Sequence, residues 1–505
     1  MKSVLYVLLC CTTSLCAQLT LPEGNYLGYL QLSDGIHPIR LALHNDSTIV
    51  RLPELSPDTK ILGEYDGSNL QFALQHTDWR LNFNEQQNRR YTGTVIRNGE
   101  SGQVKLYLLA KDQSIDTAPF CQNYSVYDHG VLSIWQQQGT LRMHSPVSGR
   151  VSRLYKIFPT EFVSDAGEHL SFASLHEGAY QGGWYRFGLS TTHHIDQLPP
   201  LATTVINRQE VMILGDTVGM SLYLPGGDGP FPACIIPMGA ANYERWIYTM
   251  EARILAAHGI ATLIYDNYGS GKSGGTLQDK TFADKRDQAV ALHNWLAVQP
   301  KIQADGIGFR GGSQGGRLSL MAAAKVPNTA FVIALSAPLE TRLDQQLYAF
   351  SAHHRQRGFP EEAIARNADL WRRFFQAVAN ERSDVSIDPD LAALRSAHPQ
   401  MILPQPTNGQ VPSLPWAADL KDDGRTYLGK INCPVLALYG TEDDRVPARR
   451  SANLLREGLI KAGKQPPEII LYSGASHAFQ LPGQRIVPGL FMDQVRFIRS
   501  VTQTK

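Results

Sequence analysis

The sequence predicts two structural regions, a β-rich N-terminal region and a C-terminal α/β domain built on a largely parallel sheet. From Gly24 to about Gly188, apolar and polar residues alternate and no long helical pattern interrupts them. After Val205, short apolar runs alternate with longer helical stretches, which is typical of a parallel sheet covered on both faces. A chain of 505 residues is also too long for one compact core.

Composition and charge indicate a globular protein and argue against two classes of partner. Apolar residues make up 43% of the chain and charged residues 18%, and the formal net charge is +1. Nucleic acids and acidic membrane surfaces bind clusters of Lys and Arg, and no such run stands out in the sequence. Neither is therefore expected as a partner.

Residues 1–17 are expected to be a signal peptide. Lys2 gives the segment a positive start, and Val4–Cys11 is apolar but too short to span a bilayer. The small residue Ala17 is suited to signal-peptide cleavage after it, which would make Gln18 the first residue of the mature chain. The protein is therefore expected to be exported, to the periplasm or the exterior. No other stretch is apolar enough for a membrane helix. A lipid-anchored form is the alternative, but mostly bulky residues precede the three cysteines on which it would depend: Cys10, Cys11 and Cys16.

The β-rich region is predicted to cover residues 18–190. Hairpin-turn dipeptides recur every 32 residues, at Asp34-Gly35, Asp66-Gly67 and Asn98-Gly99. This spacing indicates a meander of antiparallel strands, although three turns are too few to define a repeat.

Residues 189–204 are predicted to be a linker, because they contain Thr-Thr-His-His and Leu-Pro-Pro-Leu. His193 and His194 are weighed as metal ligands, but adjacent linker histidines usually face solvent. No C-x-x-C or H-E-x-x-H pair is present, so no metal or cofactor is implied. Three scattered cysteines outside the signal segment make no disulfide framework: Cys121, Cys234 and Cys433.

The α/β domain is predicted to cover residues 205–505. Helical patterns lie at Phe282–Ala297 and Gln314–Lys325, between the apolar runs. About a hundred residues after Leu335 contain no convincing strand, which predicts a helical cap at about 336–428 inserted into the sheet. The predicted strands are Ala233–Ile236, Ala261–Tyr265, Gly306–Phe309, Phe331–Leu335, Val435–Tyr439 and Glu468–Tyr472.

The main chemical signal is the motif Gly311-Gly312-Ser313-Gln314-Gly315-Gly316. It follows a predicted strand and opens a predicted helix, which is the context of a nucleophile elbow. Such an elbow holds its serine on a strained turn, and the neighbouring glycines are expected to relieve crowding between strand and helix. Ser313 is therefore the predicted nucleophile.

An acid and a base follow in the order that a catalytic triad of this kind requires. Asp443 comes just after the strand Val435–Tyr439, and His477 lies in a small-residue loop after the last strand. His477 is expected to move the proton of the serine, and Asp443 to hold the histidine tautomer. The backbone N–H groups of Gln314 and Ala240 are the predicted oxyanion hole.

These motifs resemble the α/β-hydrolase superfamily over residues 206–503. Within it, they are similar to secreted bacterial esterases and to the catalytic domains of prolyl-oligopeptidase-like enzymes. Gly229–Ala233 resembles the lead-in to the oxyanion strand, and Gly440–Pro447 fits G-x-x-D-x-x-V-P, which selects Asp443 over Asp444. The oxyanion loop departs from the family pattern, because Met238 stands where His is usual. The N-terminal third is not covered.

The segment Gly269-Ser270-Gly271-Lys272-Ser273 has an alternative interpretation as a phosphate-binding loop. Such a loop needs a glycine five residues before its Gly-Lys-Ser glycine, and that position is Asp266. With Asp266 included, the segment resembles the D-x-x-G-x-G-x-S turn of the hydrolases instead.

The resemblance implies a serine hydrolase that cleaves carboxylic esters, with a small-molecule or carbohydrate ester as substrate. Two alternatives stay open: a serine peptidase of the prolyl-oligopeptidase-like type, and a non-catalytic or carbohydrate-binding protein acting through its β-rich region. Nothing in the sequence indicates an oligomeric state. Apolar residues of the predicted cap are candidates for an acyl pocket or for the cap's own core: Leu347, Phe350, Phe374 and Phe375.

Overall fold

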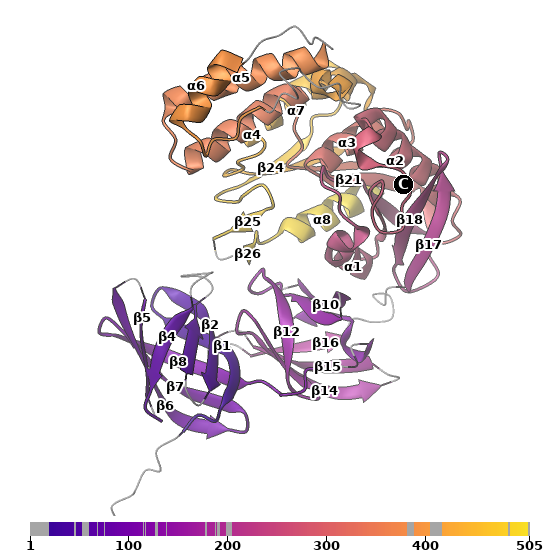
Figure 1. Cartoon of the computed structure of the whole chain (residues 1–505). Helices are drawn as coiled ribbons and strands as arrows, with labels where there is room; N and C mark the ends of the chain where they lie inside the picture. The colour runs from indigo at the N-terminus through magenta and orange to yellow at the C-terminus, as the bar shows by residue number, and fades with distance from the viewer. Residues whose placement is uncertain are drawn as a thin grey trace, which may run out of the picture. The chain divides into compact units, whose positions relative to one another are not determined.

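A computed structural model of the chain describes most of its residues (Figure 1). The described residues are 20–502 except 45–46, 53–59, 68, 75, 115, 117, 127–129, 138, 177–178, 187, 189–191, 198–204, 381–387, 405–416 and 483–484. The predicted signal peptide, residues 1–17, and the side chains of His193 and His194 lie outside them.

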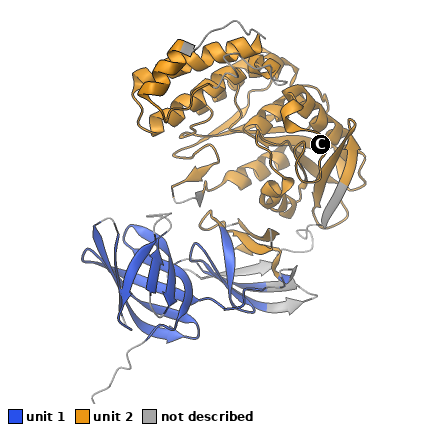
Figure 2. Cartoon of the chain, in the orientation of Figure 1, with its two compact units in different colours: residues 1–119, 152–195 blue, residues 120–151, 196–505 orange. Residues whose placement is uncertain are grey.

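The chain forms two compact units (Figure 2). One contains residues 1–119 and 152–195, and the other contains residues 120–151 and 196–505. The β-rich segment 120–151 therefore groups with the α/β part, whereas the sequence suggested a single change of domain between residues 190 and 205.

Strands β1–β8 form a closed antiparallel barrel. The predicted turn dipeptides join β1 to β2, β4 to β5 and β7 to β8, and Asn98-Gly99 takes positive φ values of 48° and 83°, as a tight hairpin turn requires. The strands are β1 Gly24–Leu32, β2 Gly35–His44, β3 Ser47–Arg51, β4 Ile61–Tyr65, β5 Asn69–Leu74, β6 Thr77–Gln87, β7 Arg90–Arg97 and β8 Glu100–Leu108. Pairing of β1 with β8, with Tyr26 opposite Leu108, closes the barrel.

Strands β9–β16 form a second closed sheet, in the order β10-β11-β12-β13-β14-β15-β16-β9. The strands are β9 Asn123–Val126, β10 Gly130–Gln137, β11 Thr140–His144, β12 Val151–Phe158, β13 Glu161–Ser164, β14 His169–His176, β15 Ala179–Arg186 and β16 Thr192–Gln197. Strand β16 lies where the sequence predicted a linker, so that prediction is wrong for residues 192–197.

The α/β part is built on an eight-stranded sheet in the order β17-β18-β20-β19-β21-β22-β23-β24. Its strands from β19 onward are parallel, whereas β17 and β18 are antiparallel. The strands are β17 Val205–Ile213, β18 Asp216–Leu224, β19 Phe231–Ile236, β20 Ala261–Tyr265, β21 Ile302–Gly312, β22 Val332–Leu335, β23 Val435–Gly440 and β24 Glu468–Tyr472. A small hairpin, β25 Gln480–Leu481 and β26 Arg485–Ile486, follows the last strand.

Helices cover both faces of this sheet, as continuous apolar strands require (Figure 1). Alternate residues face opposite sides: Ile235 packs with α2, α3 and α7, and Ile236 packs with α1 and α8. The helices are α1 Thr249–Ala257, α2 Phe282–Ala297, α3 Gln314–Ala323, α4 Arg342–Gln356, α5 Glu361–Ala379, α6 Asp388–Ala397, α7 Ala448–Lys461 and α8 Leu490–Thr502. Within the described residues, no helix combines the length and apolar character needed to cross a bilayer.

Segment 120–151 contributes directly to the core beneath α1 and α8. Trp135 of β10 is only 4% exposed and belongs to the same apolar cluster as Ile254 of α1 and Val495 of α8. The backbone N–H of Ile486 donates to the carbonyl of Gly149 at 2.6 Å. A Cβ on Gly149 would lie 2.5 Å from the carbonyl oxygen of Ile486, so the turn and the hairpin meet backbone to backbone.

Buried histidines should make stability depend on pH. Burial lowers the pKa of His293, on the buried face of α2, although the Asn294 side chain opposes the shift. As pH falls, His293 is therefore protonated in the unfolded chain before it is protonated in the folded chain. Its contribution to the free energy of unfolding is complete above the ordinary histidine pKa of about 6.5 and is lost as pH falls below that value. We expect His293→Leu to flatten the decline of the free energy of unfolding between pH 7 and pH 5, measured by urea melts. An unchanged slope would contradict this assignment.

Candidate active site

Three side chains predicted to act together follow parallel strands of the large sheet. Ser313 follows β21 directly, Asp443 lies three residues beyond β23, and His477 lies five residues beyond β24. The carboxyl ends of parallel strands open at the same edge of a sheet. The topology therefore brings all three to that edge.

Ser313 sits on a strained turn between β21 and α3. Its φ of 56° and ψ of −124° lie outside the regions that non-glycine residues favour, at a cost of about 1–3 kcal/mol. Its N–H donates to the carbonyl of Leu335 at 2.8 Å, and its own carbonyl accepts from Gly316 at 3.0 Å. These backbone bonds hold the turn in place against its strain.

Crowding accounts for three of the four glycines around Ser313. A Cβ on Gly311 would lie 2.1 Å from the carbonyl oxygen of Gly315, and one on Gly315 would lie 2.3 Å from that of Pro237. A Cβ on Gly316 would lie 2.7 Å from the Cβ of Ala337. No atom lies within 4 Å of a Cβ on Gly312, so that glycine borders open space and is not required by packing.

His477 and Asp443 form a hydrogen-bonded pair. The Nδ1 atom of His477 lies 2.8 Å from Oδ2 and 2.9 Å from Oδ1 of Asp443. The Asp443 side chain is fully buried, and its Oδ1 also accepts from the N–H groups of Arg445 and Val446 at 2.8 Å each. A carboxylate at Nδ1 favours the tautomer with its proton there, which leaves Nε2 as the proton acceptor.

Asp444 faces a different neighbour. Its carboxylate accepts from the side-chain amide of Gln356 in α4, at 3.4 Å. Of these two adjacent acids, Asp443 is the one that contacts His477, in agreement with the motif spacing.

Ser336 is part of the site but was missed by the sequence analysis. It follows β22, has a positive φ of 44°, and donates from Oγ to the carbonyl of His477 at 3.1 Å. Its N–H donates to the carbonyl of Leu438 at 2.8 Å. Ser336 thus ties the histidine loop to the strand next to the serine turn. Its place directly after a predicted strand was the only available signal.

The loop predicted to carry an oxyanion donor is held by side-chain amides. Gln314, the first residue of α3, donates from Nε2 to the carbonyl of Gly239 at 3.2 Å. Asn267 donates to the carbonyl of Ala241 at 3.0 Å. Ala240 lies between these two anchored carbonyls and is exposed, and the buried Met238 precedes it. The loop is thus fixed beside the N-terminus of α3 although the usual histidine is absent.

The turn after β20 wraps a carboxylate of the chain itself. Asp266 is buried, pairs with the guanidinium of Arg245, and accepts from the N–H of Lys272 at 2.9 Å. Ser273 donates from Oγ to the carbonyl of Asp266 at 2.9 Å. The Lys272 amide that a phosphate loop would offer to its ligand is therefore already occupied. No group of three His, Cys, Asp or Glu residues suited to a metal ion occurs in the described part of the chain.

Helices α4–α6 lie between β22 and β23 in sequence, and α4 contacts the loop that carries the acid. The hydroxyl of Tyr348 donates to the carbonyl of Asp443 at 2.8 Å, and Gln345 donates to the carbonyl of Arg445 at 2.8 Å. Most of the residues considered for an acyl pocket are packed instead in the helices' own core: Leu347, Phe374 and Phe375 are buried there, with Phe350 against them.

The strand order, the strained serine turn and the buried acid–histidine pair together define an α/β-hydrolase, and the chain belongs to the α/β-hydrolase superfamily. More narrowly, residues 215–464 match the model of the S15 family of X-Pro dipeptidyl-peptidases. That match covers the elbow and the acid, but it ends before His477.

Two curated relatives match shorter stretches. One is 2,6-dihydropseudooxynicotine hydrolase of Paenarthrobacter nicotinovorans, 30% identical over 135 residues, which is 26% of this chain and 36% of the relative. The other is acyl-coenzyme A amino acid N-acyltransferase 2 of Rattus norvegicus, 26% identical over 149 residues, which is 28% of this chain and 34% of the relative. The chain thus matches only about a third of the length of either.

Solved structures also resemble the chain. Est1E of Butyrivibrio proteoclasticus with bound ferulic acid is 17% identical, with 58% of this chain and 96% of that chain covered and a TM-score of 0.37. Proline iminopeptidase of Mycobacterium smegmatis is 18% identical, with 59% and 98% covered and a TM-score of 0.39.

Proposed function

We propose that the protein is a serine hydrolase in which Ser313, His477 and Asp443 form the catalytic triad. The observation that carries the proposal is the fully buried Asp443 carboxylate at Nδ1 of His477, on the same sheet edge as the strained turn of Ser313. A buried carboxylate that orients an imidazole beside a serine elbow is the arrangement that serine hydrolases use.

The proposed reaction has two halves. Ser313 Oγ attacks the acyl carbon while His477 Nε2 takes the serine proton, and the N–H groups of Gln314 and Ala240 stabilise the oxyanion. His477 then returns the proton to the leaving alcohol, and an acyl-enzyme remains. His477 then takes a proton from a water molecule that attacks the acyl-enzyme, and gives this proton to the departing oxygen of Ser313, which releases the acid and restores the serine.

We further propose that helices α4–α6 cap the site and that the substrate is a carboxylic ester. The bonds from Tyr348 and Gln345 to the acid loop support a cap, because they fix α4 next to the triad acid. An ester has a better leaving group than an amide, so its cleavage requires less stabilisation of the leaving group by the active site. The sequence also supports export, through a signal peptide at residues 1–17. N-terminal sequencing of the mature protein from the periplasm or medium, with Gln18 first, would test this last point.

The runner-up is a serine peptidase, and the match of residues 215–464 to the X-Pro dipeptidyl-peptidase family favours it specifically. A non-catalytic or carbohydrate-binding role through the β-rich region is a third candidate. A fluorophosphonate probe distinguishes this candidate from both enzymes, since a serine hydrolase reacts with the probe and a binding protein does not.

A substrate panel separates the ester from the peptide proposal. We expect the full-length protein to cleave p-nitrophenyl acetate and butyrate with kcat/KM at least about 100-fold above that for Ala-Pro and Gly-Pro p-nitroanilides. The Ser313→Ala protein, purified in parallel, controls for contaminating hydrolases. Amide cleavage with a kcat/KM similar to that of the best ester would reject the ester proposal and favour the peptidase.

A further inference from the structure

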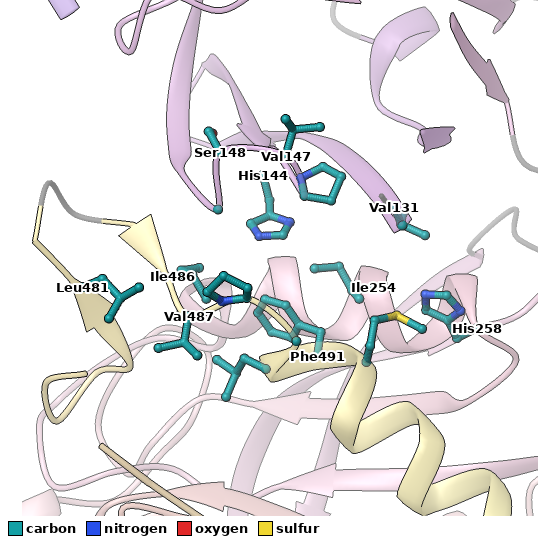
Figure 3. Close-up of a pocket in the computed structure, with 17 residues that line it drawn as sticks. Val131, His144, Val147, Ser148, Ile254, His258, Leu481, Ile486, Val487 and Phe491 are labelled. Carbon is teal, nitrogen blue, oxygen red and sulfur yellow. The ribbon is translucent and has the colours of Figure 1, made fainter. Parts of the chain in front are cut away.

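A cavity lies apart from the proposed triad, within the same compact unit (Figure 3). Its volume is about 350 Å³. Its walls are the turn at residues 145–149, helix α1, the β25–β26 hairpin and the start of α8. We call it the α1–α8 cavity; none of Ser313, Asp443 and His477 lines it.

The described lining of the α1–α8 cavity is mainly apolar. Among its described lining residues there is no Asp, Glu, Lys or Arg. In Figure 3, Val131 and Val147 lie on one side of the cavity, and Ile254, Val487 and Phe491 lie on the other. A charged molecule placed here would lose its hydration without gaining an ionic partner, at a cost of several kcal/mol. The lining therefore selects an uncharged occupant.

Two histidines give this apolar space a polar component. His144 is 5% exposed, and its ring meets that of Phe491 edge to face with centroids 5.3 Å apart. Among the described residues, the buried Nδ1 atom of His144 and the buried Nε2 atom of His258 have no hydrogen-bond partner. Neither of these two atoms is open to the cavity, so an occupant can pair only with the other ring nitrogen, Nε2 of His144 or Nδ1 of His258.

Burial keeps both imidazoles neutral. It lowers the pKa of His144 to about 4 and that of His258 to about 4, the latter helped by Arg499. A neutral imidazole has one donor and one acceptor nitrogen. A hydroxyl group can pair with a ring nitrogen of either kind, because it both donates and accepts.

We propose that the α1–α8 cavity binds an uncharged, mainly apolar small molecule that carries a hydroxyl group, with His144 as its hydrogen-bond partner. An apolar cavity of about 150 Å³ holds a benzene ring, so this larger one has room for a ring with a short alkyl chain. An alkylphenol matches this chemistry. The proposal does not depend on the catalytic assignment.

Calorimetric titration of the full-length protein with 4-butylphenol tests the proposal. We expect one site with millimolar or tighter affinity, and binding of the size-matched anion 4-butylbenzoate at least about tenfold weaker. Val147→Trp, which fills the cavity from the turn, should weaken 4-butylphenol binding at least about tenfold. The matched control Val298→Trp, at the exposed end of α2, should bind like the unmodified protein.

His144→Phe gives a second, independent readout. It keeps an aromatic ring against Phe491 but removes the ring nitrogens, and loss of one hydrogen bond should weaken binding about fivefold. Melting temperatures would show whether each variant remains folded. The proposal is overturned if 4-butylphenol does not bind, if 4-butylbenzoate binds equally well, or if folded Val147→Trp binds like the control. Unchanged affinity in folded His144→Phe would remove the assigned hydrogen bond and overturn the proposal as stated.

Discussion

Ser313→Ala should lower ester hydrolysis by about 10⁶-fold, to the level that the oxyanion donors and substrate binding sustain without a nucleophile. The same change should abolish labelling by a fluorophosphonate probe, because the probe forms its covalent bond with the serine oxygen. Removal of one hydroxyl leaves the backbone bonds from Ser313 to Leu335 and Gly316 intact, so the fold should persist. Initial rates and gel-based labelling on one preparation measure both effects.

Ser473→Ala is the matched control, since Ser473 is exposed in the loop before His477 and has no role in the proposed chemistry. It should retain full activity and labelling. Circular dichroism should show the same folded signal for both variants. Undiminished turnover in folded Ser313→Ala would refute Ser313 as the nucleophile.

Asp443→Asn should lower kcat by about 10⁴-fold, whereas Asp444→Asn should leave it nearly unchanged. An amide at position 443 no longer holds the proton on Nδ1 of His477 or stabilises the imidazolium that forms during the reaction. Asp444 contacts Gln356 and not the histidine, so its charge is dispensable for the proton transfer. Steady-state kinetics of the two variants with the best ester make the comparison.

The adjacent position controls for any general effect of losing a negative charge from this loop. Equal losses of kcat in the two variants would indicate that a change in loop structure, rather than loss of the hydrogen bond to His477, lowers the rate. A larger loss in Asp444→Asn would move the triad acid by one residue.

Much of the α/β domain was predictable because its local and long-range signals agree. Helix Phe282–Ala297 and strands Ala261–Tyr265 and Glu468–Tyr472 have the predicted bounds. The helix begins at a capping box, in which Thr281 and Asp284 bond each other's backbone N–H groups. The predicted residues of the candidate site also lie at one sheet edge, because the loops that follow parallel strands all begin at the same edge of the sheet.

Features that depend on contacts distant in sequence were not predictable in the same way. Alternation indicated a meander, but closure of the first barrel rests on β1 meeting β8, about 80 residues further along the chain. Ser336 has no motif, and its role comes from its reach to the carbonyl of His477. The aromatic residues of α5 fit an acyl pocket and a helical core equally well by pattern, and packing decides for the core.

The link between Gly149 and Ile486 bears on how such a protein can be assembled by recombination. The similarity to hydrolases begins near residue 206, which suggests that recombination could transfer the α/β domain as one contiguous segment. Yet Trp135 packs in the cluster under α1 and α8, and the carbonyl of Gly149 accepts from Ile486 in the hairpin that follows His477. A block that starts after residue 200 would leave both partners behind. The compact unit is discontinuous in sequence, so a transfer that keeps this core intact would have to carry segment 120–151 together with residues 196–505.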